Sequence, residues 1–175
     1  MLKIVLQEAL GRFSHRPGAA MRATFFGTLV ALSSLLSAPV SAQNGMPTEA
    51  QRLPVTGLRA GMHLIQAEIA QTPREHAIGL MFRTEMGANE GMIFAFPKEA
   101  KQCFWMKNTL IPLAVAFVDD KGEIVNLDEM QAQTEAPHCS TRPVRFVLEM
   151  NKGWFIKHGI KVGMKLAGAP FGAAH

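Results

Sequence analysis

The pattern that most restricts the fold lies at residues 144–151, where apolar and polar side chains alternate. An extended strand places alternate residues on opposite faces. The apolar members of the pattern are Val144, Phe146, Leu148 and Met150. The polar members are Arg145, Glu149 and Asn151. A period of two is typical of a half-buried β-strand, so the segment predicts a strand with Glu149 on its polar side.

Other short segments follow one another between turn signals. Strands are expected at residues 62–70, 92–96, 103–110, 114–119 and 160–166, and a long loop at residues 131–143. One short helix is expected from Thr72 to about Met81, because Pro73 and Glu75 complete a helix-capping pattern, and another at residues 154–157. The predicted fold is a mainly β single domain with one or two short helices, either a compact β-sandwich or a barrel-like domain.

The beginning of the chain has the organisation of a cleavable secretory signal. Arg22 precedes an apolar run at residues 23–36, and small residues lead to a cleavage site after Ala42. A buried helix or an uncleaved anchor is the alternative, and translation from Met21 is a further possibility. We expect residues 1–42 to be a signal peptide, residues 43–54 a linker, residues 55–166 the folded domain and residues 167–175 a flexible tail. The mature protein would be periplasmic or extracellular, with no stable membrane span.

Charge is concentrated in this predicted leader. Residues 1–42 hold four of the 18 Lys and Arg residues and one of the 14 Asp and Glu residues. Residues 43–175 therefore carry 14 basic and 13 acidic side chains, close to neutrality. A surface without excess positive charge is a poor match for a phosphate backbone, so no nucleic-acid partner is expected.

Both cysteines, Cys103 and Cys139, lie in the predicted mature part. Export would make a disulfide between them chemically possible. Two cysteines alone do not determine whether their geometry suits a bridge. A disulfide and two free thiols therefore both remain open from the sequence.

Four stretches resemble one protein family, in the family's order. They are GLMFR at residues 79–83, GMIF at 91–94, FWMKNTLIPL at 104–113 and VLE at 147–149. On these motifs the chain resembles the DUF192 family, also called UPF0127, over about residues 55–166. The resemblance implies a compact, mainly β domain that is often secreted, of uncharacterised activity, and it carries over no catalytic residue. A bridge between Cys103 and Cys139 would be a feature of this member rather than of the family.

The motif around Trp105 contains the candidate binding residues. In a strand, Trp105 and Lys107 would share one face and offer a flat apolar ring beside a cation, which suits a sugar or an anion. Asn108 would lie on the other face and would either brace a neighbouring loop or line a pocket. Arg83 and Glu149 could complete a charged cluster, although Glu149 could instead form a structural ion pair with Arg145, two strand positions away on the same face.

Metal binding and nucleophilic catalysis are less well supported. Nine methionines in residues 43–175, with Cys103, His138 and Cys139, raise the possibility of copper binding, but core packing explains the methionines without a metal. His138 and Cys139 are adjacent, and neighbours in an extended segment point apart, so no catalytic dyad is expected. No metal ligand set, cofactor or catalytic residue is predicted.

These features together predict a small exported β domain, most simply a ligand-binding or interaction module of the cell envelope. Its candidate binding residues are Arg83, Trp105, Lys107, Asn108 and Glu149. The partner would be an unidentified small molecule or envelope component, and we expect a monomer. The alternative is an envelope hydrolase or transferase in which Lys107 and Glu149 act as acid and base.

Overall fold

Strands occupy much of residues 48–171, the part of the chain that the computed structural model describes. They are β1 (Val55–Ala60), β2 (His63–Ala70), β3 (Glu90–Ala100), β4 (Cys103–Phe104), β5 (Leu113–Val118), β6 (Ile124–Met130), β7 (His138–Cys139), β8 (Val144–Asn151) and β9 (Leu166–Gly168). Two short helices are α1 (Pro73–Ile78) and α2 (Trp154–Lys157). The predicted signal peptide, residues 43–47 of the predicted linker and residues 172–175 of the predicted tail lie outside the described residues.

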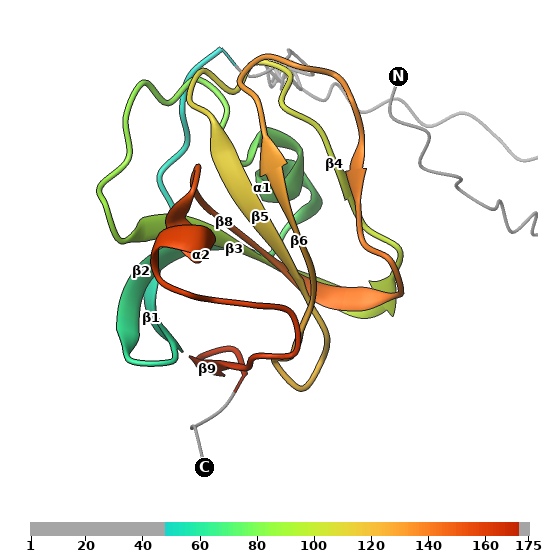
Figure 1. Cartoon of the computed structure of the whole chain (residues 1–175). Coiled ribbons are helices and arrows are strands. Elements are labelled where there is room, and N and C mark those ends of the chain that lie inside the picture. Colours follow the sequence, from blue (N-terminus) through green and yellow to red (C-terminus); the bar gives the residue numbers. More distant parts are fainter. Residues whose placement is uncertain (1–47, 172–175) are drawn as a thin grey trace, which may run out of the picture. The chain divides into compact units, whose positions relative to one another are not determined.

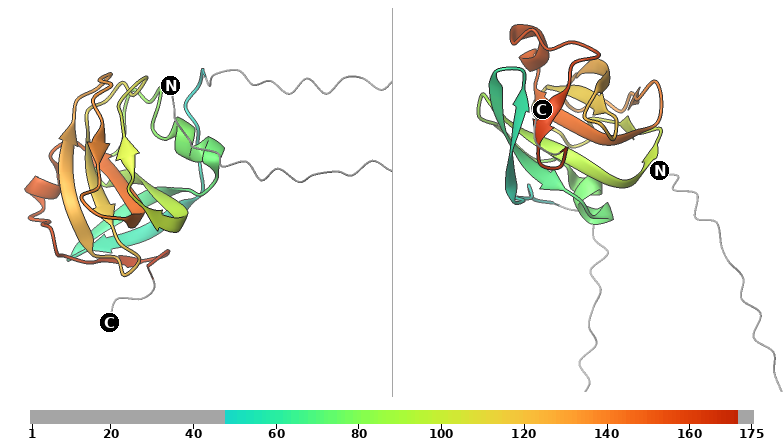
Figure 2. Two further views of the ribbon diagram at one scale, coloured as in Figure 1. Left: turned by 90° about the vertical axis from the view of Figure 1, so that its right-hand side faces the viewer. Right: turned by 90° about the horizontal axis from the view of Figure 1, so that it is seen from below.

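Seven of these strands form one sheet, in the order β6-β5-β8-β3-β2-β1-β9. β2 and β3 run parallel, because α1 carries the chain back between them, and the other neighbours run antiparallel. The sheet curls into a half-barrel (Figures 1 and 2). Its two ends meet through an isolated bridge between Glu123 and Lys165, beside a 2.8 Å bond from Leu166 N to Gly122 O. The prediction of a mainly β, barrel-like domain is confirmed.

Curling divides the apolar residues into two clusters. Within the half-barrel, Leu58, Ile124 and Leu166 from the two ends of the sheet share one cluster with Trp154 and Phe155 of α2. The second cluster lies on the convex face, where side chains of β3, β5 and β8 pack against residues from the segments that cover them. Its buried members are Ala70, Leu80, Met92, Phe94, Met106, Leu113, Val115, Phe117, Met130, Val144 and Val147. The central strand β8 is thus covered on both faces.

The beginning of α1 follows the predicted capping pattern. The Thr72 hydroxyl accepts a hydrogen bond from Glu75 N, and the Glu75 carboxylate accepts one from Thr72 N in return. These bonds satisfy backbone donors that the first helical turn leaves free. The helix ends at Ile78 rather than near Met81, because Gly79 has a φ of 49° and leaves the helical conformation.

The strand expected at residues 103–110 is wrong beyond Phe104. The chain forms a turn there, in which Thr109 N bonds to Met106 O and Asn108 has a left-handed φ of 60°. Asn tolerates this conformation better than most residues, so the turn interrupts the strand. The last strand is β9 rather than residues 160–166, β7 forms within the expected loop, and β1 had no predicted counterpart.

Within residues 48–171, no helix has the length and apolar character needed to cross a bilayer.

Candidate functional site

Three loops meet on the convex side of the sheet and form what we call the loop cluster, residues 79–86, 105–112 and 131–136. Phe82 N donates to Asn108 O at 2.9 Å, which joins the first two loops. Gln133 N donates to Thr109 O at 3.0 Å, and Met106 N donates to Thr134 O at 2.9 Å, which join the second loop to the third. These backbone hydrogen bonds hold the three loops together.

Each loop also contains a residue in a left-handed backbone conformation that is not glycine. These residues are Phe82, Asn108 and Gln133, with φ values of 64°, 60° and 60°. A residue other than glycine has a strained backbone in this conformation. Such residues are retained where contacts with the surrounding structure hold them, which is common at binding and catalytic sites. In the loop cluster, the surroundings that hold these residues include the inter-loop hydrogen bonds.

Trp105 and Lys107 come together in the loop cluster, although the strand that was expected to align them does not form. Lys107 Nζ lies over the Trp105 ring, 5.4 Å from its centroid, and 3.5 Å from Glu135 Oε1. The Lys107 side chain is 38% exposed and that of Glu135 is 61% exposed. The structure therefore presents a ring and a cation to solvent, with an acidic neighbour on the third loop.

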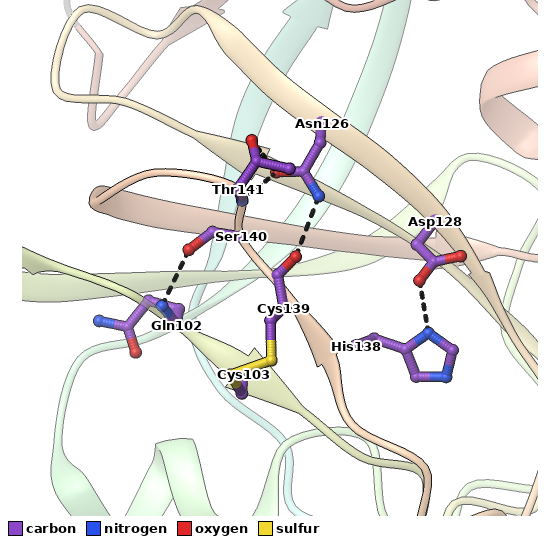
Figure 3. The surroundings of a disulfide bond; sticks show 8 residues. All are labelled: Gln102, Cys103, Asn126, Asp128, His138, Cys139, Ser140 and Thr141. Atoms are coloured by element: carbon purple, nitrogen blue, oxygen red, sulfur yellow. Dashed lines mark hydrogen bonds and ion pairs between the residues drawn. A yellow bond between two sulfur atoms is a disulfide. The ribbon is translucent and has the colours of Figure 1, made fainter.

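A disulfide joins Cys103 of β4 to Cys139 of β7, which are directly opposite in a two-stranded ladder (Figure 3). Gln102 N donates to Ser140 Oγ at 3.0 Å, and Ser140 N donates to Gln102 O at 2.8 Å. The bridge and these bonds attach the chain just before Trp105 to the chain that follows the third loop. Because both sulfurs are bonded to each other, they are not available as thiolate ligands for copper.

Beside the disulfide, His138 Nδ1 donates to Asp128 Oδ2 at 2.6 Å (Figure 3). His138 points away from the disulfide, so His138 and Cys139 form no dyad, as expected. The His138–Asp128 pair was not predicted from the sequence, because the two residues are ten positions apart. The return of the chain past β6 brings them together. Within the described residues, no group of three or more His, Cys, Asp or Glu side chains is arranged to hold a metal ion.

Arg83 is buried beneath the loop cluster rather than exposed beside Lys107. Its side chain is 2% exposed, and its Nη2 donates to Glu68 Oε2 at 2.6 Å and to Gln51 O at 2.9 Å. Its Nε is buried and has no hydrogen-bond partner among the described residues. Arg83 is thus held by an ion pair with a residue of β2 that the sequence analysis did not select.

The partner of Arg83, Glu68, remains charged despite its burial. Burial acts to raise the pKa of Glu68, but hydrogen bonds from Arg83 and Leu53 N and the charges of Arg83 and Arg52 outweigh it, so the pKa lies below its usual value. Alternation along residues 62–70 places Glu68 beside Gln66 on the polar face, and this pattern gives no sign of a buried ion pair.

Glu149 is buried, contrary to the prediction that it lies on a solvated face of its strand. It is 4% exposed, and its cross-strand neighbours are Val115 of β5 and Met92 of β3, both fully buried. Burial raises its pKa to about 8, with no charge or hydrogen bond acting in the other direction. Glu149 is therefore protonated in the folded protein at neutral pH.

The expected pairing of Glu149 with Arg145 does not form. Arg145 Nε instead donates to Phe96 O at 3.1 Å, and the guanidinium lies 5.3 Å from the centroid of the Phe146 ring. β8 places both Glu149 and Arg145 on the convex face. Glu149 is buried there, whereas Arg145 is exposed.

The five candidate residues thus occupy one side of the sheet but divide into three parts. Trp105 and Lys107 contact each other at the surface, while Asn108 contributes its backbone carbonyl to the contact with Phe82. Arg83 and Glu149 are buried in separate surroundings. None of the five lines the pocket beside Trp154 and Lys157 or the one beside Leu58 and Ile65.

The solved structures that resemble this chain include two bacterial proteins. One, from Sinorhizobium meliloti 1021 and provisionally described as a transcription regulator, is 33% identical, with a TM-score of 0.62 over 66% of this chain and 92% of the other. The second, a protein of unknown function from Novosphingobium aromaticivorans DSM 12444, is 36% identical, with a TM-score of 0.60 over 74% of this chain and 97% of the other. The comparison with curated proteins found no match.

The family comparison agrees with the motifs of the sequence. Residues 56–168 match the model of the DUF192 family, which is described as an uncharacterized ACR. This span includes every strand from β2 to β9 and most of β1. The chain belongs to the DUF192 family.

Proposed function

We propose that this protein is an exported small β domain that binds a ligand of the cell envelope through its loop cluster. Trp105 and Lys107 make the direct contacts. Export rests on the arrangement of Arg22, the apolar run at residues 23–36 and the small residues before Gln43. The domain keeps its ligand chemically unchanged and acts as a binding or interaction module.

The observation that carries this proposal is the fixed placement of a ring and a cation side by side. Lys107 Nζ lies 5.4 Å from the Trp105 ring centroid, on a loop whose backbone bonds to both neighbouring loops. A binding surface that is ordered before the ligand arrives loses less conformational entropy on binding. The disulfide between Cys103 and Cys139 contributes to this order, two residues before Trp105.

The chemistry of the pair favours a sugar with an acidic group. The apolar face of a pyranose ring can pack against Trp105, and a carboxylate can replace Glu135 as the partner of Lys107. Replacement costs little, because the Lys107–Glu135 contact is largely exposed and such pairs contribute about 0–1 kcal/mol. The provisional description of the S. meliloti protein suggests nucleic acid as another ligand, but the near-neutral charge of residues 43–175 gives that no support.

A carbohydrate-binding titration tests the proposal. We expect glucuronate-containing oligosaccharides to quench Trp105 fluorescence and to raise the melting temperature of the purified protein. Trp105→Ala and Lys107→Ala should each weaken binding by about tenfold or more. Trp154→Phe is the matched control, since Trp154, the first residue of α2, is buried within the half-barrel. Binding that is unchanged in both loop variants would refute the proposed surface.

Export is tested separately. The full chain, expressed in a Gram-negative host, should appear in the periplasmic fraction with Gln43 as its first residue. Retention of the uncleaved chain in the cytoplasm would refute export without affecting the binding proposal.

A second candidate function, an envelope hydrolase or transferase, is favoured by one observation. Glu149 has a pKa of about 8 through burial, and raised carboxyl pKa values are a property of general acids. In that case Glu149 would donate a proton and Lys107 would orient the substrate. If the protein is an enzyme, it should form a product, and Glu149→Gln should abolish product formation. If it is a binding module, the ligand should remain intact and its binding should depend on Lys107.

A further inference from the structure

A pocket of about 400 Å³ lies where β8 leads into α2, apart from the loop-cluster residues Trp105 and Lys107. Its walls come from the loop before β3, the end of β8 and α2, and they include Asn89, Asn151, Lys152, Gly153, Lys157 and His158. The volume falls within the range of small-molecule sites, about 300–1,000 Å³. A Cβ built on Gly153 would meet no atom within 4 Å, so the space beside this residue is open.

The charged groups of this pocket are cationic. Lys152 and Lys157 are both exposed, and neither forms an ion pair with a residue of the described part of the chain. Two ammonium groups at one cavity that form no ion pair attract an anion.

The polar groups are oriented by bonds on their far sides. Asn89 Oδ1 accepts from Trp154 Nε1 at 3.1 Å, which leaves the Asn89 Nδ2 donor free. His158 Nδ1 donates to Trp154 O at 2.8 Å, which leaves His158 Nε2 free. The His158 ring packs against Trp154, with centroids 4.3 Å apart, and against His63, with centroids 4.5 Å apart.

The turn between β8 and α2, which lines the pocket, is also held in place by hydrogen bonds. Asn151 Nδ2 donates to Gly87 O at 2.9 Å and so attaches β8 to the loop before β3. Glu129 accepts a hydrogen bond from Gly153 N at 3.0 Å. Both walls are therefore fixed before a ligand arrives, which lowers the entropic cost of binding.

We propose that this pocket is a second ligand site, which takes a small organic dianion, either a dicarboxylate or a phosphate monoester. Lys152 and Lys157 provide the charge for the two negative groups, and Asn89 Nδ2 donates a hydrogen bond. Two cations match two negative charges, and a pocket of about 400 Å³ has room for a small organic ligand that carries them.

Isothermal titration of the purified protein with four probes tests this site. Succinate and glycerol 3-phosphate are the dianions, and succinamide and glycerol are their neutral counterparts. We expect saturable binding of at least one dianion with a dissociation constant on the order of millimolar, with no saturation by either neutral probe. The dianion that binds more tightly identifies the acidic group. The absence of saturable binding by both dianions, or equal binding by a neutral counterpart, overturns the proposal.

Charge-matched variants locate the site. Lys152→Gln combined with Lys157→Gln should weaken binding about tenfold or more, whereas Lys121→Gln combined with Lys161→Gln removes the same charge from exposed positions elsewhere and should change it less than about twofold. Ala88→Trp, which fills the pocket from its wall, should also abolish binding while the circular dichroism spectrum stays unchanged. Equal losses in both lysine pairs would overturn the assignment. Trp105→Ala should leave this binding intact, so the two proposals fail independently.

Discussion

Glu68 and Glu149 lie in one cross-strand row on the convex face of the sheet with only Met92 between them, yet their pKa values move in opposite directions. Burial opposes ionisation of both carboxyl groups. Arg83 and Leu53 N compensate Glu68 with hydrogen bonds, while no group compensates Glu149. The partners that Glu68 has and Glu149 lacks keep Glu68 charged in spite of its burial.

Glu149→Gln should stabilise the protein at neutral and mildly alkaline pH. The folded pKa of about 8 lies above the unfolded value near 4.5, so the unfolded state releases the proton first. Wild-type stability is therefore fully present below pH 4.5 and falls by up to about 1.4 kcal/mol per pH unit until about pH 8. At pH 7.5 the variant, which cannot ionise, should be about 2–4 kcal/mol more stable in urea denaturation.

A matched carboxylate on the surface controls for that effect. Glu85 is exposed, so Glu85→Gln should leave the pH dependence of unfolding unchanged. Plots of the free energy of unfolding against pH that run parallel for wild type and Glu149→Gln between pH 5 and 8 would contradict the prediction. They would show that Glu149 is ionised in the folded protein.

Removal of Arg83 should be costly because it leaves Glu68 buried without its main partner. Arg83→Met should lower the free energy of unfolding by about 3–5 kcal/mol at pH 7. In wild type, the depressed pKa of Glu68 gives stability that is present above the unfolded pKa and lost as pH falls through the folded pKa. The gap in stability between wild type and variant should therefore narrow as the pH falls and Glu68 becomes protonated in the variant while it stays charged in wild type.

Arg52 provides the control for Arg83, since it contacts the same carboxylate. Its Nη1 lies 3.5 Å from Glu68 Oε1, but its side chain is 70% exposed. Arg52→Met should cost less than about 1 kcal/mol, as is usual for exposed ion pairs. A similar cost for both variants, measured by urea denaturation, would contradict a dominant role for the buried pair.

Local patterns were enough to predict several parts of this fold. The alternation at residues 144–151 predicted β8, and the capping pattern from Thr72 predicted α1, because both depend on neighbours in sequence. The contact between Trp105 and Lys107 was also expected, although a turn rather than a strand produces it. Residues two positions apart can meet in more than one backbone conformation.

The buried charges could not be predicted in the same way. Alternation along β8 assigned Glu149 to a solvated face, since the pattern contains no information about what covers that face. That face is covered by segments distant in sequence, since Leu80 and Met106 share a cluster with Met92 and Val115, the cross-strand neighbours of Glu149. The Arg83–Glu68 pair likewise joins residues 15 positions apart, which pack together only after α1 reverses the chain.

Substitutions of Asn108 should separate a backbone role from ligand recognition by its side chain. Its left-handed φ of 60° suits Gly and Asn, so Asn108→Gly should change stability by less than about 0.5 kcal/mol, while Asn108→Ala should cost about 1 kcal/mol. Thermal or urea unfolding measures both. Because Asn108 contributes its carbonyl to Phe82 N, Asn108→Gly should also retain ligand binding at the loop cluster. Loss of binding in a stable Asn108→Gly variant would assign the side chain to ligand recognition.

Loss of the disulfide should lower stability without dismantling the two strands that it joins. Cys103 and Cys139 are 36 positions apart, and opening a loop of this length costs about 3–4 kcal/mol in the chain-entropy model. Cys103→Ser combined with Cys139→Ser should show this loss in urea denaturation and should be insensitive to added reductant, whereas reductant should destabilise wild type by a similar amount. Hydrogen bonds between Gln102 and Ser140 persist in the variant, so the near-ultraviolet signal of Trp105 should be largely retained. A wild-type protein whose stability does not respond to reductant, and which retains two alkylatable thiols under denaturing conditions, would show that the bridge does not form.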